Sequence, residues 1–337
     1  MPKAMKREDV KISCLVCTLT APISIEKLLD SLLSQEWVRG DELILIDNGM
    51  SSDRRIQIEQ RLKDFTKCGI SAQCHQEPQR GVVHARIKSI QVSKNPWLFS
   101  LDDDNIVTPG ALQQIRQRIF DYPTLGGLCP RLEPVWEVQP ETWAVALGHQ
   151  VLSYNVSQQH ASPYQWCVWK PGVVGQRPPT GGMLIAKTVA EDFIRLCSQV
   201  PLILSFTPRT GQRLTGEDFI LYSLIYMRKD LVTAYDDSIV VQHHIPERRT
   251  QLSYLIRTMF WSNYSFGIQG LMRFGKARVL YVMIRGIGRL LYEFVRQSAD
   301  VISWRVVFGY LAGCLGFLYG VLAGLVDPEC KRIHIDP

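Results

Sequence analysis

The sequence predicts an α/β fold, in which a mixed sheet flanked by helices is followed by a helical C-terminal extension that associates with a membrane. Strand and helix patterns alternate with short connections over the first hundred residues, which is typical of parallel βαβ units. Near the C-terminus, residues 306–326 form an uncharged, apolar stretch of 21 residues. Such a stretch is long enough to cross the hydrocarbon core of a bilayer.

The elements follow from short apolar runs bounded by turn residues and from apolar residues that recur every three or four positions. The expected strands are 12–19, 42–46, 70–74, 97–101, 183–186, 231–234 and 238–242. The expected helices are 24–33, 54–65, 83–92, 188–197 and one that opens at Thr215. Residues 121–182 contain eight prolines and four tryptophans, so we expect an irregular binding region there.

Composition restricts the class of protein. A length of 337 residues fits one large α/β domain or a catalytic domain with an appendage. The hydrophobic fraction of 46% and the charged fraction of 21% exclude wholesale disorder. The nine cysteines are odd in number and scattered, and the first ten residues lack an apolar core. We therefore expect no secretory signal and a reducing, cytosolic setting.

The net charge of +6 arises entirely from the last part of the chain. Residues 241–337 contain 12 basic and 6 acidic side chains, whereas residues 1–240 contain 26 of each. Ten of the basic residues lie between 248 and 305, opposed only by Glu293 and Asp300. This basic segment favours an anionic membrane surface over nucleic acid, because no motif for reading a groove or stacking on bases accompanies it.

Two helices are expected within residues 251–297, with a break near 267–275. On the second helix, Arg278, Arg285, Arg289 and Arg296 are spaced to share one face. The stretch 306–326 would then either span the bilayer once or lie in its interface, with membrane lipids as partners. A buried helix of a soluble domain is the alternative.

The residues that indicate chemistry are acidic. Asp102, Asp103 and Asp104 directly follow the predicted strand 97–101, and Asp47 follows the strand 42–46. Adjacent carboxylates repel each other unless they share a cation, and oxygen ligands suit Mg²⁺ or Mn²⁺. The alternative is a solvated acidic turn that caps the next helix. Because ligands bind beyond the carboxyl ends of such strands, we expect the functional site there.

The ordered set of motifs resembles the family 2 glycosyltransferases of GT-A fold. The set comprises the strand 12–19, the run 43–49 with Ser51-Ser52-Asp53, Glu77 and Gly81 with Ala85-Arg86, the run 101–104, and Thr215-Gly216-Glu217-Asp218. Each motif alone is common, but the order and spacing together are specific. His243-His244-Ile245-Pro246 with Arg248-Arg249 also resembles the segment after the last core strand in bacterial polysaccharide-assembly members.

The resemblance covers about residues 11–250 and implies four regions. These are an N-terminal tail (1–10), a nucleotide-sugar-binding catalytic domain of GT-A type (11–250), a basic amphipathic helical region (251–300), and an apolar membrane-associating helix with its tail (301–337).

The resemblance also implies roles for single residues. Asp218 is the expected catalytic base, with Glu217 as the fallback, and Asp104 and Asp102 are the expected metal ligands. The expected donor-binding residues are Thr18, Asp47, Arg86, Asp102, Asp103, His244 and Arg249, with His243 competing for the role of His244.

Three departures from the family pattern matter. Thr18-Leu19-Thr20-Ala21-Pro22 stands where the family often shows Pro-Thr-Tyr-Asn, and Met50 is an extra residue between Gly49 and Ser51. No Gln-x-x-Arg-Trp follows the acidic pair, although processive synthases carry one. Transfer of a single sugar is therefore favoured over polymerisation.

These expectations combine into an inverting, metal-dependent glycosyltransferase that uses Mg²⁺ or Mn²⁺ and a nucleotide-sugar donor, such as a UDP-sugar. It would transfer one sugar to a glycan or lipid-linked acceptor in bacterial cell-surface polysaccharide biosynthesis, at the cytoplasmic face of the inner membrane. A sugar nucleotidyltransferase is disfavoured because residues 18–27 contain no glycine for its phosphate loop. A membrane-anchored glycan-binding scaffold without turnover is disfavoured by the intact acidic set.

Overall fold

A computed structural model describes residues 6–152, 166–169, 181–206, 216–228, 230–298, 303–330 and 332–333. The chain divides into two compact units. The first contains Met1–Val135, Tyr154–Ile194 and Leu221–His244. The second contains Trp136–Ser153, Arg195–Ile220 and Ile245–Pro337. Thr215, where a helix was predicted to begin, lies outside the described residues.

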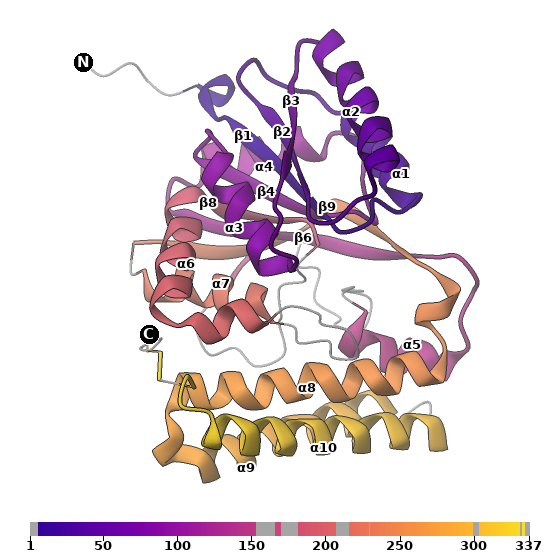
Figure 1. Cartoon of the computed structure of the whole chain (residues 1–337), viewed down its shortest axis with the longest axis vertical. Coiled ribbons are helices and arrows are strands. Elements are labelled where there is room, and N and C mark those ends of the chain that lie inside the picture. The colour runs from indigo at the N-terminus through magenta and orange to yellow at the C-terminus, as the bar shows by residue number, and fades with distance from the viewer. Residues whose placement is uncertain are drawn as a thin grey trace. The chain divides into compact units, whose positions relative to one another are not determined.

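The first unit is built on one mixed sheet, in the strand order β3-β2-β1-β4-β8-β6-β9-β5, with β7 paired to β9 (Figure 1). The strands are β1 (Ile12–Thr18), β2 (Glu42–Asp47), β3 (Ser71–Gln76), β4 (Trp97–Asp102), β5 (Asn105–Val107), β6 (Leu125–Trp136), β7 (Trp166–Trp169), β8 (Met183–Ala186) and β9 (Val232–Ile245). Strands β1 to β4 pair in parallel, whereas β8 is antiparallel to β4 and β6, and β5 and β7 are antiparallel to β9. The predicted α/β fold with a mixed sheet is confirmed.

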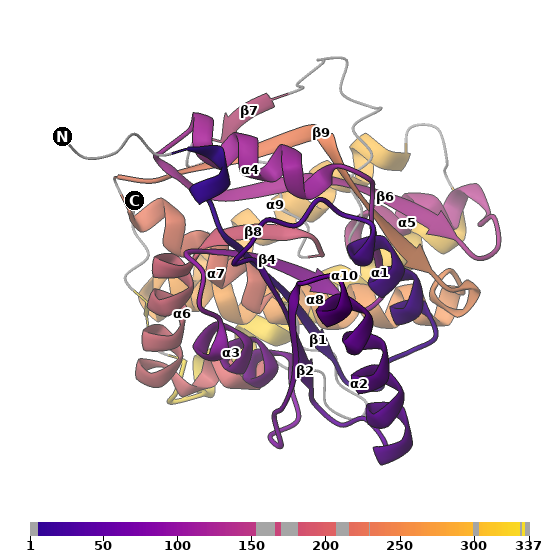
Figure 2. The ribbon, with the colours of Figure 1, turned by 90° about the horizontal axis from the view of Figure 1, so that it is seen from above.

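Helices cover both sides of β1 and β2. The helices outside the C-terminal region are α1 (Ser24–Leu33), α2 (Ser52–Lys67), α3 (Val82–Val92), α4 (Ala111–Asp121), α6 (Lys187–Gln199) and α7 (Glu217–Met227). Figure 2 shows α1 and α2 on one side of these strands and α3 on the other. In α1, the fully buried residues Ile25, Leu28, Leu29 and Leu32 follow the helical period and share one core with the alternate residues Ile12, Cys14 and Val16 of β1.

The strands and helices predicted for the first 104 residues are confirmed, with ends within two residues of those expected. Two later predictions are wrong. Strand β9 is continuous over Val232–Ile245, where two strands were predicted. Strand β6 and helix α5 (Thr142–Val151) lie in the stretch predicted to be irregular. The first six residues of β6 are all buried, so this strand lacks the alternation that identifies half-buried strands.

The second unit is helical. It contains α5, α8 (Leu252–Phe274), α9 (Val279–Ser298) and α10 (Trp304–Val326), together with the short 3-10 helices η3 (Pro201–Ser205), η4 (Glu247–Arg249) and η5 (Lys276–Arg278). Another 3-10 helix, η1 (Arg7–Asp9), belongs to the first unit. The predicted break between two C-terminal helices occurs at Gly275, whereas α8 continues through Gly267 and Gly270.

Helices α8 and α10 pack in parallel along a stripe of glycines. A Cβ atom at Gly316 would overlap the carbonyl group of Phe260, and one at Gly320 would overlap that of Tyr264. Gly267 lies equally close to the backbone of α10. The two helix backbones therefore approach as closely as small residues allow, in the way that small-xxx-small sequences permit.

Among the described helices, α10 alone is long and apolar enough to cross a membrane, with a mean hydropathy of 2.0 over its most apolar window. However, 44% of that window is buried inside the protein. A buried core helix passes the same test, so this helix by itself is weak evidence for membrane association.

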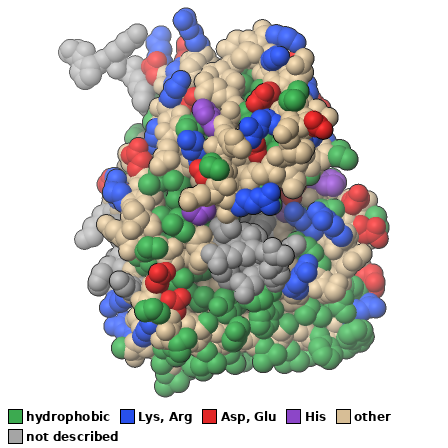
Figure 3. All heavy atoms as spheres, viewed as in Figure 1, with side chains coloured by type: hydrophobic (Ala, Val, Ile, Leu, Met, Phe, Trp, Pro, Cys, Tyr) green, Lys and Arg blue, Asp and Glu red, His purple; other side chains and the backbone are tan. Residues whose placement is uncertain are grey.

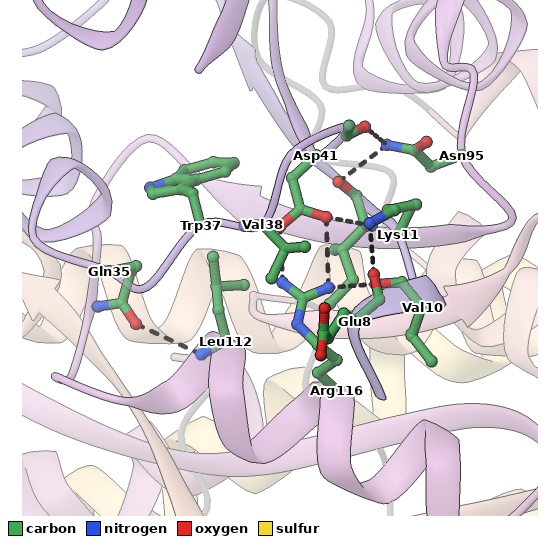
Figure 4. A network of polar contacts seen from close by, with 12 residues as sticks. Glu8, Val10, Lys11, Gln35, Trp37, Val38, Asp41, Asn95, Leu112 and Arg116 are labelled. Atoms are coloured by element: carbon green, nitrogen blue, oxygen red, sulfur yellow. Dashed lines mark hydrogen bonds and ion pairs between the residues drawn. The ribbon is translucent and has the colours of Figure 1, made fainter. Parts of the chain in front are cut away.

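A buried ion pair connects the first strands with α4 (Figure 4). Arg116 Nη2 lies 2.6 Å from Asp41 Oδ2, and both side chains are almost fully buried. The same carboxylate also accepts hydrogen bonds from the backbone N–H groups of Ile12 and Val38, each at 2.9 Å. Arg116 also donates to the carbonyl of Val10. The pair thus fixes the starts of β1 and β2 against α4.

We expect Arg116→Met to lower the free energy of unfolding by about 3–5 kcal/mol, because it leaves the carboxylate of Asp41 buried without its partner cation. Arg61→Met in α2 is the matched control, because Arg61 pairs with Glu26, Asp30 and Asp64 at the surface, and we expect it to cost no more than about 1 kcal/mol. Chemical denaturation followed by circular dichroism measures both. Equal losses of unfolding free energy in the two variants would show that the buried ion pair contributes no more to stability than the surface ion pairs of Arg61.

Candidate active site

The carboxyl ends of β1, β2 and β4 lie side by side at one edge of the sheet. The strand register places Thr18 opposite Asp47, and Cys17 opposite Asp102. Three of the predicted site residues are therefore brought together by strand pairing alone. This edge is where α/β sheets bind their ligands.

The acidic residues after β4 form a tight turn into β5. Asn105 is fully buried, and its Oδ1 atom accepts a hydrogen bond of 2.8 Å from the backbone N–H of Asp102. Gly181 approaches the turn closely, since a Cβ atom there would come within 3.0 Å of both Asp102 Oδ2 and Asn105 Oδ1. The turn is thus held from within and tolerates only a glycine at residue 181 in this position.

A histidine of β9 lies against this turn. His243 Nε2 is 3.3 Å from Asp104 Oδ2, and the imidazole of His243 is buried. His244 interacts with the turn through its backbone, since its N–H donates to the carbonyl of Asp104 at 2.8 Å. The ring beside the acidic turn therefore belongs to His243, whereas the sequence analysis favoured His244. Alternation along a strand allows only one of two successive side chains on that side.

Thr18 joins the end of β1 to the acidic turn. Its hydroxyl donates to the carboxylate of Asp103 and accepts the backbone N–H of Ala21 at 2.8 Å. Ser24 strengthens the junction by donating to the carbonyl of Asp103 at 3.2 Å. Ala21 adopts a φ of +44°, a strained value for a residue with a side chain. These bonds hold the loop after β1, where the sequence departs from the family pattern, against Asp103.

Asp47 is enclosed by the loop that follows it. Burial alone would raise the pKa of this carboxyl, but hydrogen bonds from the backbone N–H groups of Gly49 and Met50, and an ion pair with Arg55, hold the pKa below its usual value. Met50, the extra residue of the sequence analysis, thus supplies one of the donors. Arg55 was missed, because nothing in the sequence distinguishes it from the other charged residues of α2.

Asn48 organises the loop between β3 and α3. Its Oδ1 atom accepts from the N–H of Gly81 at 2.7 Å, and its Nδ2 atom donates to the carbonyls of Glu77 and Gln79 at 2.9 and 2.7 Å. The Glu77 and Gly81 motif is therefore fixed beside the end of β2. Sequence reasoning recorded Asn48 only as part of a motif and did not find this role.

Arg86 lies on α3 and is 5% exposed. Its positive charge acts on Cys17 near the end of β1. Burial raises the pKa of the Cys17 thiol to about 11, and the positive charge of Arg86 is the largest influence that lowers this pKa. Cys17 is thus a protonated thiol at neutral pH. Arg86 contributes a buried positive charge near the carboxyl edge.

The remaining predicted site residues belong to the second unit. Glu217 and Asp218 form the first turn of α7, Glu217 buried and Asp218 half-buried. Gly216 precedes them with a φ of +106°, and a Cβ atom there would overlap the side-chain amide of Gln269. Arg249 is half-buried at the end of η4.

The acidic turn suits a divalent cation only in part. No group of three or more His, Cys, Asp or Glu side chains within the described ranges is arranged to hold a metal ion. Asp102 and Asp104 nevertheless offer hard oxygen ligands at the end of β4. Mg²⁺ is typically held by one or two carboxylates plus substrate phosphates, so this donor set fits a metal that arrives with a diphosphate.

Comparison with known proteins supports the fold and the family. The family model "Glycosyl transferase family 2" matches residues 13–163. The mannosyltransferase PcManGT of Pyrobaculum calidifontis, solved with GDP-Man and Mn²⁺, superposes with a TM-score of 0.54 at 13% identity, covering 94% of this chain and 87% of its own. S. aureus TarS (residues 1–349), solved with UDP-GlcNAc, gives a TM-score of 0.51 at 13% identity, covering 93% and 91%. A search of the curated proteins finds no match.

The mixed sheet with its acidic carboxyl edge is a GT-A fold, which these two structures share at low sequence identity. The matched segment 13–163 is similar to glycosyltransferase family 2, a class of enzymes that transfer glycosyl groups.

We expect Thr18→Val to weaken nucleotide binding about tenfold, because the loop after β1 loses the hydroxyl that joins Asp103 to Ala21. Calorimetric titration with UDP and GDP measures the effect. Thr66→Val is the control, since that hydroxyl only donates to a carbonyl within α2 at the exposed surface. Unchanged affinity in Thr18→Val would remove the loop after β1 from the nucleotide site.

Proposed function

We propose that the chain is an inverting, metal-dependent glycosyltransferase that moves a single sugar from a nucleotide-diphospho-sugar to a glycan or lipid-linked acceptor. One observation carries this proposal: Asp102, Asp103 and Asp104 form a buttressed acidic turn at the carboxyl edge, in register with Thr18 and Asp47. Such an arrangement suits a ligand that combines a base, a ribose and a metal-bound diphosphate.

In this proposal Asp104 and Asp102 would hold Mg²⁺ or Mn²⁺, which would supply positive charge beside the diphosphate of the donor. His243 keeps Asp104 oriented through its contact of 3.3 Å. Asp103 fixes the loop after β1 rather than contacting the metal. The PcManGT structure was solved with Mn²⁺ and GDP-Man, which supports a divalent metal together with a diphosphate donor at a site of this kind.

Donor recognition is proposed for the strand ends and the neighbouring loops. Asp47 would orient the base or ribose through the loop that it anchors, and Arg86 would supply positive charge toward the diphosphate. Arg249 and His244 are proposed at the diphosphate as well. The ligands of the two similar structures, UDP-GlcNAc and GDP-Man, are the first donors to test.

The chemical step needs one carboxylate. Asp218 would accept the proton of the acceptor hydroxyl as that oxygen attacks the anomeric carbon, and Glu217 is the alternative base. The attack breaks the bond between the anomeric carbon and the diphosphate oxygen, so a single displacement inverts the configuration. No covalent intermediate on the enzyme is required.

The acceptor and the location rest on the C-terminal region. We propose that the basic and apolar helices hold the enzyme at the cytoplasmic face of a bacterial inner membrane, where a lipid-linked acceptor for cell-surface polysaccharide would be accessible. Exposed Arg278 in η5, exposed Arg285 in α9 and the apolar helix α10 support this proposal.

We expect Asp218→Asn to reduce release of nucleoside diphosphate by roughly two to four orders of magnitude while donor binding persists, because only the proton acceptor is lost. Detergent-extracted protein is assayed with UDP-GlcNAc, GDP-Man and other donors, each with Mn²⁺, Mg²⁺ or chelator. Asp230→Asn, an exposed carboxylate just beyond α7, serves as control and should keep full activity.

Glu217→Gln distinguishes the two candidate bases, since only substitution of the true base should abolish turnover. Folded wild-type protein that neither binds nor hydrolyses any donor would overturn the transferase proposal and favour a glycan-binding scaffold.

We expect Asp104→Asn to raise the Mn²⁺ concentration needed for half-maximal activity by about 10–100-fold, since one metal-binding oxygen is replaced by a weaker ligand. Binding of Mn²⁺ in the presence of UDP, followed by electron paramagnetic resonance, should weaken in parallel. His243→Gln is the companion variant and should have a smaller effect of the same sign, because it loses the contact with Asp104 but leaves the metal-binding oxygens in place. A metal requirement that Asp104→Asn leaves unchanged would place the metal elsewhere.

A further inference from the structure

Helix α10 has two different apolar sides. One side carries the glycines that pack on α8, together with buried Val306, Tyr310, Phe317 and Val321. The other side carries large apolar residues that are more than half exposed and spaced by three or four positions: Trp304, Phe308, Leu311, Leu315, Tyr319, Leu322 and Val326. The packed side has its partner in the protein, whereas the exposed side is mostly uncovered, although the ring of Tyr319 also lies beside those of Phe260 and Tyr264 in α8.

Helix α9 extends this exposed apolar surface. It packs against α10, where Gly286 lies against the ring of Phe317, and against α8, where Gly270 lies beside Val282. Its outward side carries Leu280, Tyr281, Ile284, Leu291, Tyr292 and Val295, all exposed. We call the exposed large apolar residues of α9 and α10 the apolar face; Figure 3 shows hydrophobic side chains gathered over the helices of this unit.

The apolar face concentrates almost all of the large hydrophobic side chains that the described residues expose. Only four others are exposed, namely Leu19, Ile23, Ile56 and Val138. Soluble monomers rarely expose contiguous apolar patches of this kind, and larger ones mark interaction or membrane sites. The apolar face is therefore expected to be covered in the working protein.

Charge and aromatic residues around the face indicate what covers it. From α8 to α10 the described residues contain a single acid, Glu293, whereas Arg257, Arg278 and Arg285 are exposed. The face also presents Trp304 near one end of α10, and tyrosines on both helices. Exposed arginines match anionic head groups, and tryptophan and tyrosine prefer the boundary between head groups and hydrocarbon.

The packing of α10 opposes a transmembrane orientation. To cross the bilayer, α10 would either have to leave α8, which exposes its glycine stripe, or take α8 and α9 with it. In the second case the charged guanidinium of Arg289, whose Nη2 atom donates to Asn263 Oδ1 at 2.7 Å, would enter the hydrocarbon. A charged side chain at that depth is costly, and an in-plane orientation avoids both losses.

We propose that α9 and α10 lie in the plane of an anionic bilayer surface and insert the apolar face into its interface, so that the chain is a monotopic membrane protein. This inference rests on the membrane attachment proposed above, and it is independent of the chemistry of sugar transfer. It assigns the partner as a lipid surface rather than a second copy of the chain.

Flotation of the full chain with lipid vesicles tests the apolar face. We expect binding to vesicles of phosphatidylcholine with about 30% phosphatidylglycerol, and about tenfold weaker binding for each of Leu315→Glu and Leu322→Glu. Both residues are at least 60% exposed, so the substitutions leave the packed core intact. Ile56→Glu in α2 is the matched control, because Ile56 is equally exposed, at 64%, but lies outside the face. Vesicle binding that Leu315→Glu and Leu322→Glu leave unchanged would overturn the proposal.

The arginines are tested by lipid composition. Arg278→Gln and Arg285→Gln should each weaken binding to the anionic vesicles about fivefold and leave binding to pure phosphatidylcholine unchanged. An equal loss on both kinds of vesicle would contradict the assignment of an anionic surface.

Labelling of the two ends of α10 distinguishes in-plane from spanning orientations. A membrane-impermeant maleimide is added outside sealed vesicles that carry Ser303→Cys or Asp327→Cys protein, and labelling of each site is read by peptide mass spectrometry. We expect both sites to be labelled from the same side. Labelling of one end alone would show a spanning helix and overturn the in-plane orientation.

Two further outcomes separate this inference from its alternatives. If the chain dimerises without vesicles, and Leu315→Glu abolishes the dimer while vesicles bind neither form, the face is a protein interface and the proposal is wrong. Release of nucleoside diphosphate in detergent by Leu315→Glu should equal that of the wild type. Wild-type protein that releases nucleoside diphosphate but does not float with vesicles would overturn only the membrane inference, whereas wild-type protein that floats but releases none would overturn only the sugar-transfer proposal.

Discussion

The ion pair between Asp41 and Arg116 is the contact on which the first unit depends most. Two charges removed from water are costly, and the cost is offset here because the carboxylate accepts two backbone N–H groups as well as the guanidinium. These bonds fix the beginnings of β1 and β2. Paired strands keep their register along their length, so fixing one end also fixes where Thr18 and Asp47 meet at the other.

At the carboxyl edge, side chains that hydrogen-bond to the backbone fix the conformation of the loops. Asp47 and Asn48 each accept at least one backbone N–H of a following loop, Asn105 accepts that of Asp102 at the end of β4, and Thr18 joins two loops. Loops at such an edge would otherwise sample many conformations, which would be lost on binding a ligand. The carboxylates at this edge are thus held by neighbours whose own role is structural.

The sequence was sufficient to predict the strands and helices that have a clear hydrophobic period and the positions of the motifs. It was not sufficient to predict which side chains contact each other. The strands β1 to β4 were predicted because each is a short run between turn signals. Strand β6 was missed because burial on both faces removes the alternation. The choice between His243 and His244 depends on which side of β9 faces Asp104, and the roles of Arg55 and Asn48 depend on loop conformation. No local pattern records these facts.

Helix α10 shows why composition alone cannot place a helix in a membrane. Length and hydropathy are the same for a helix that crosses a bilayer and for one that lies along its surface, because both values average over all sides of the helix. The arrangement of residues around the axis distinguishes them. In α10 the glycines face α8, and the large side chains face outward in one stripe. One side of α10 is already packed on α8, and its neighbour α9 carries arginines. Only the other side of α10 can therefore contact lipid, and it does so when the helix lies flat in the membrane interface.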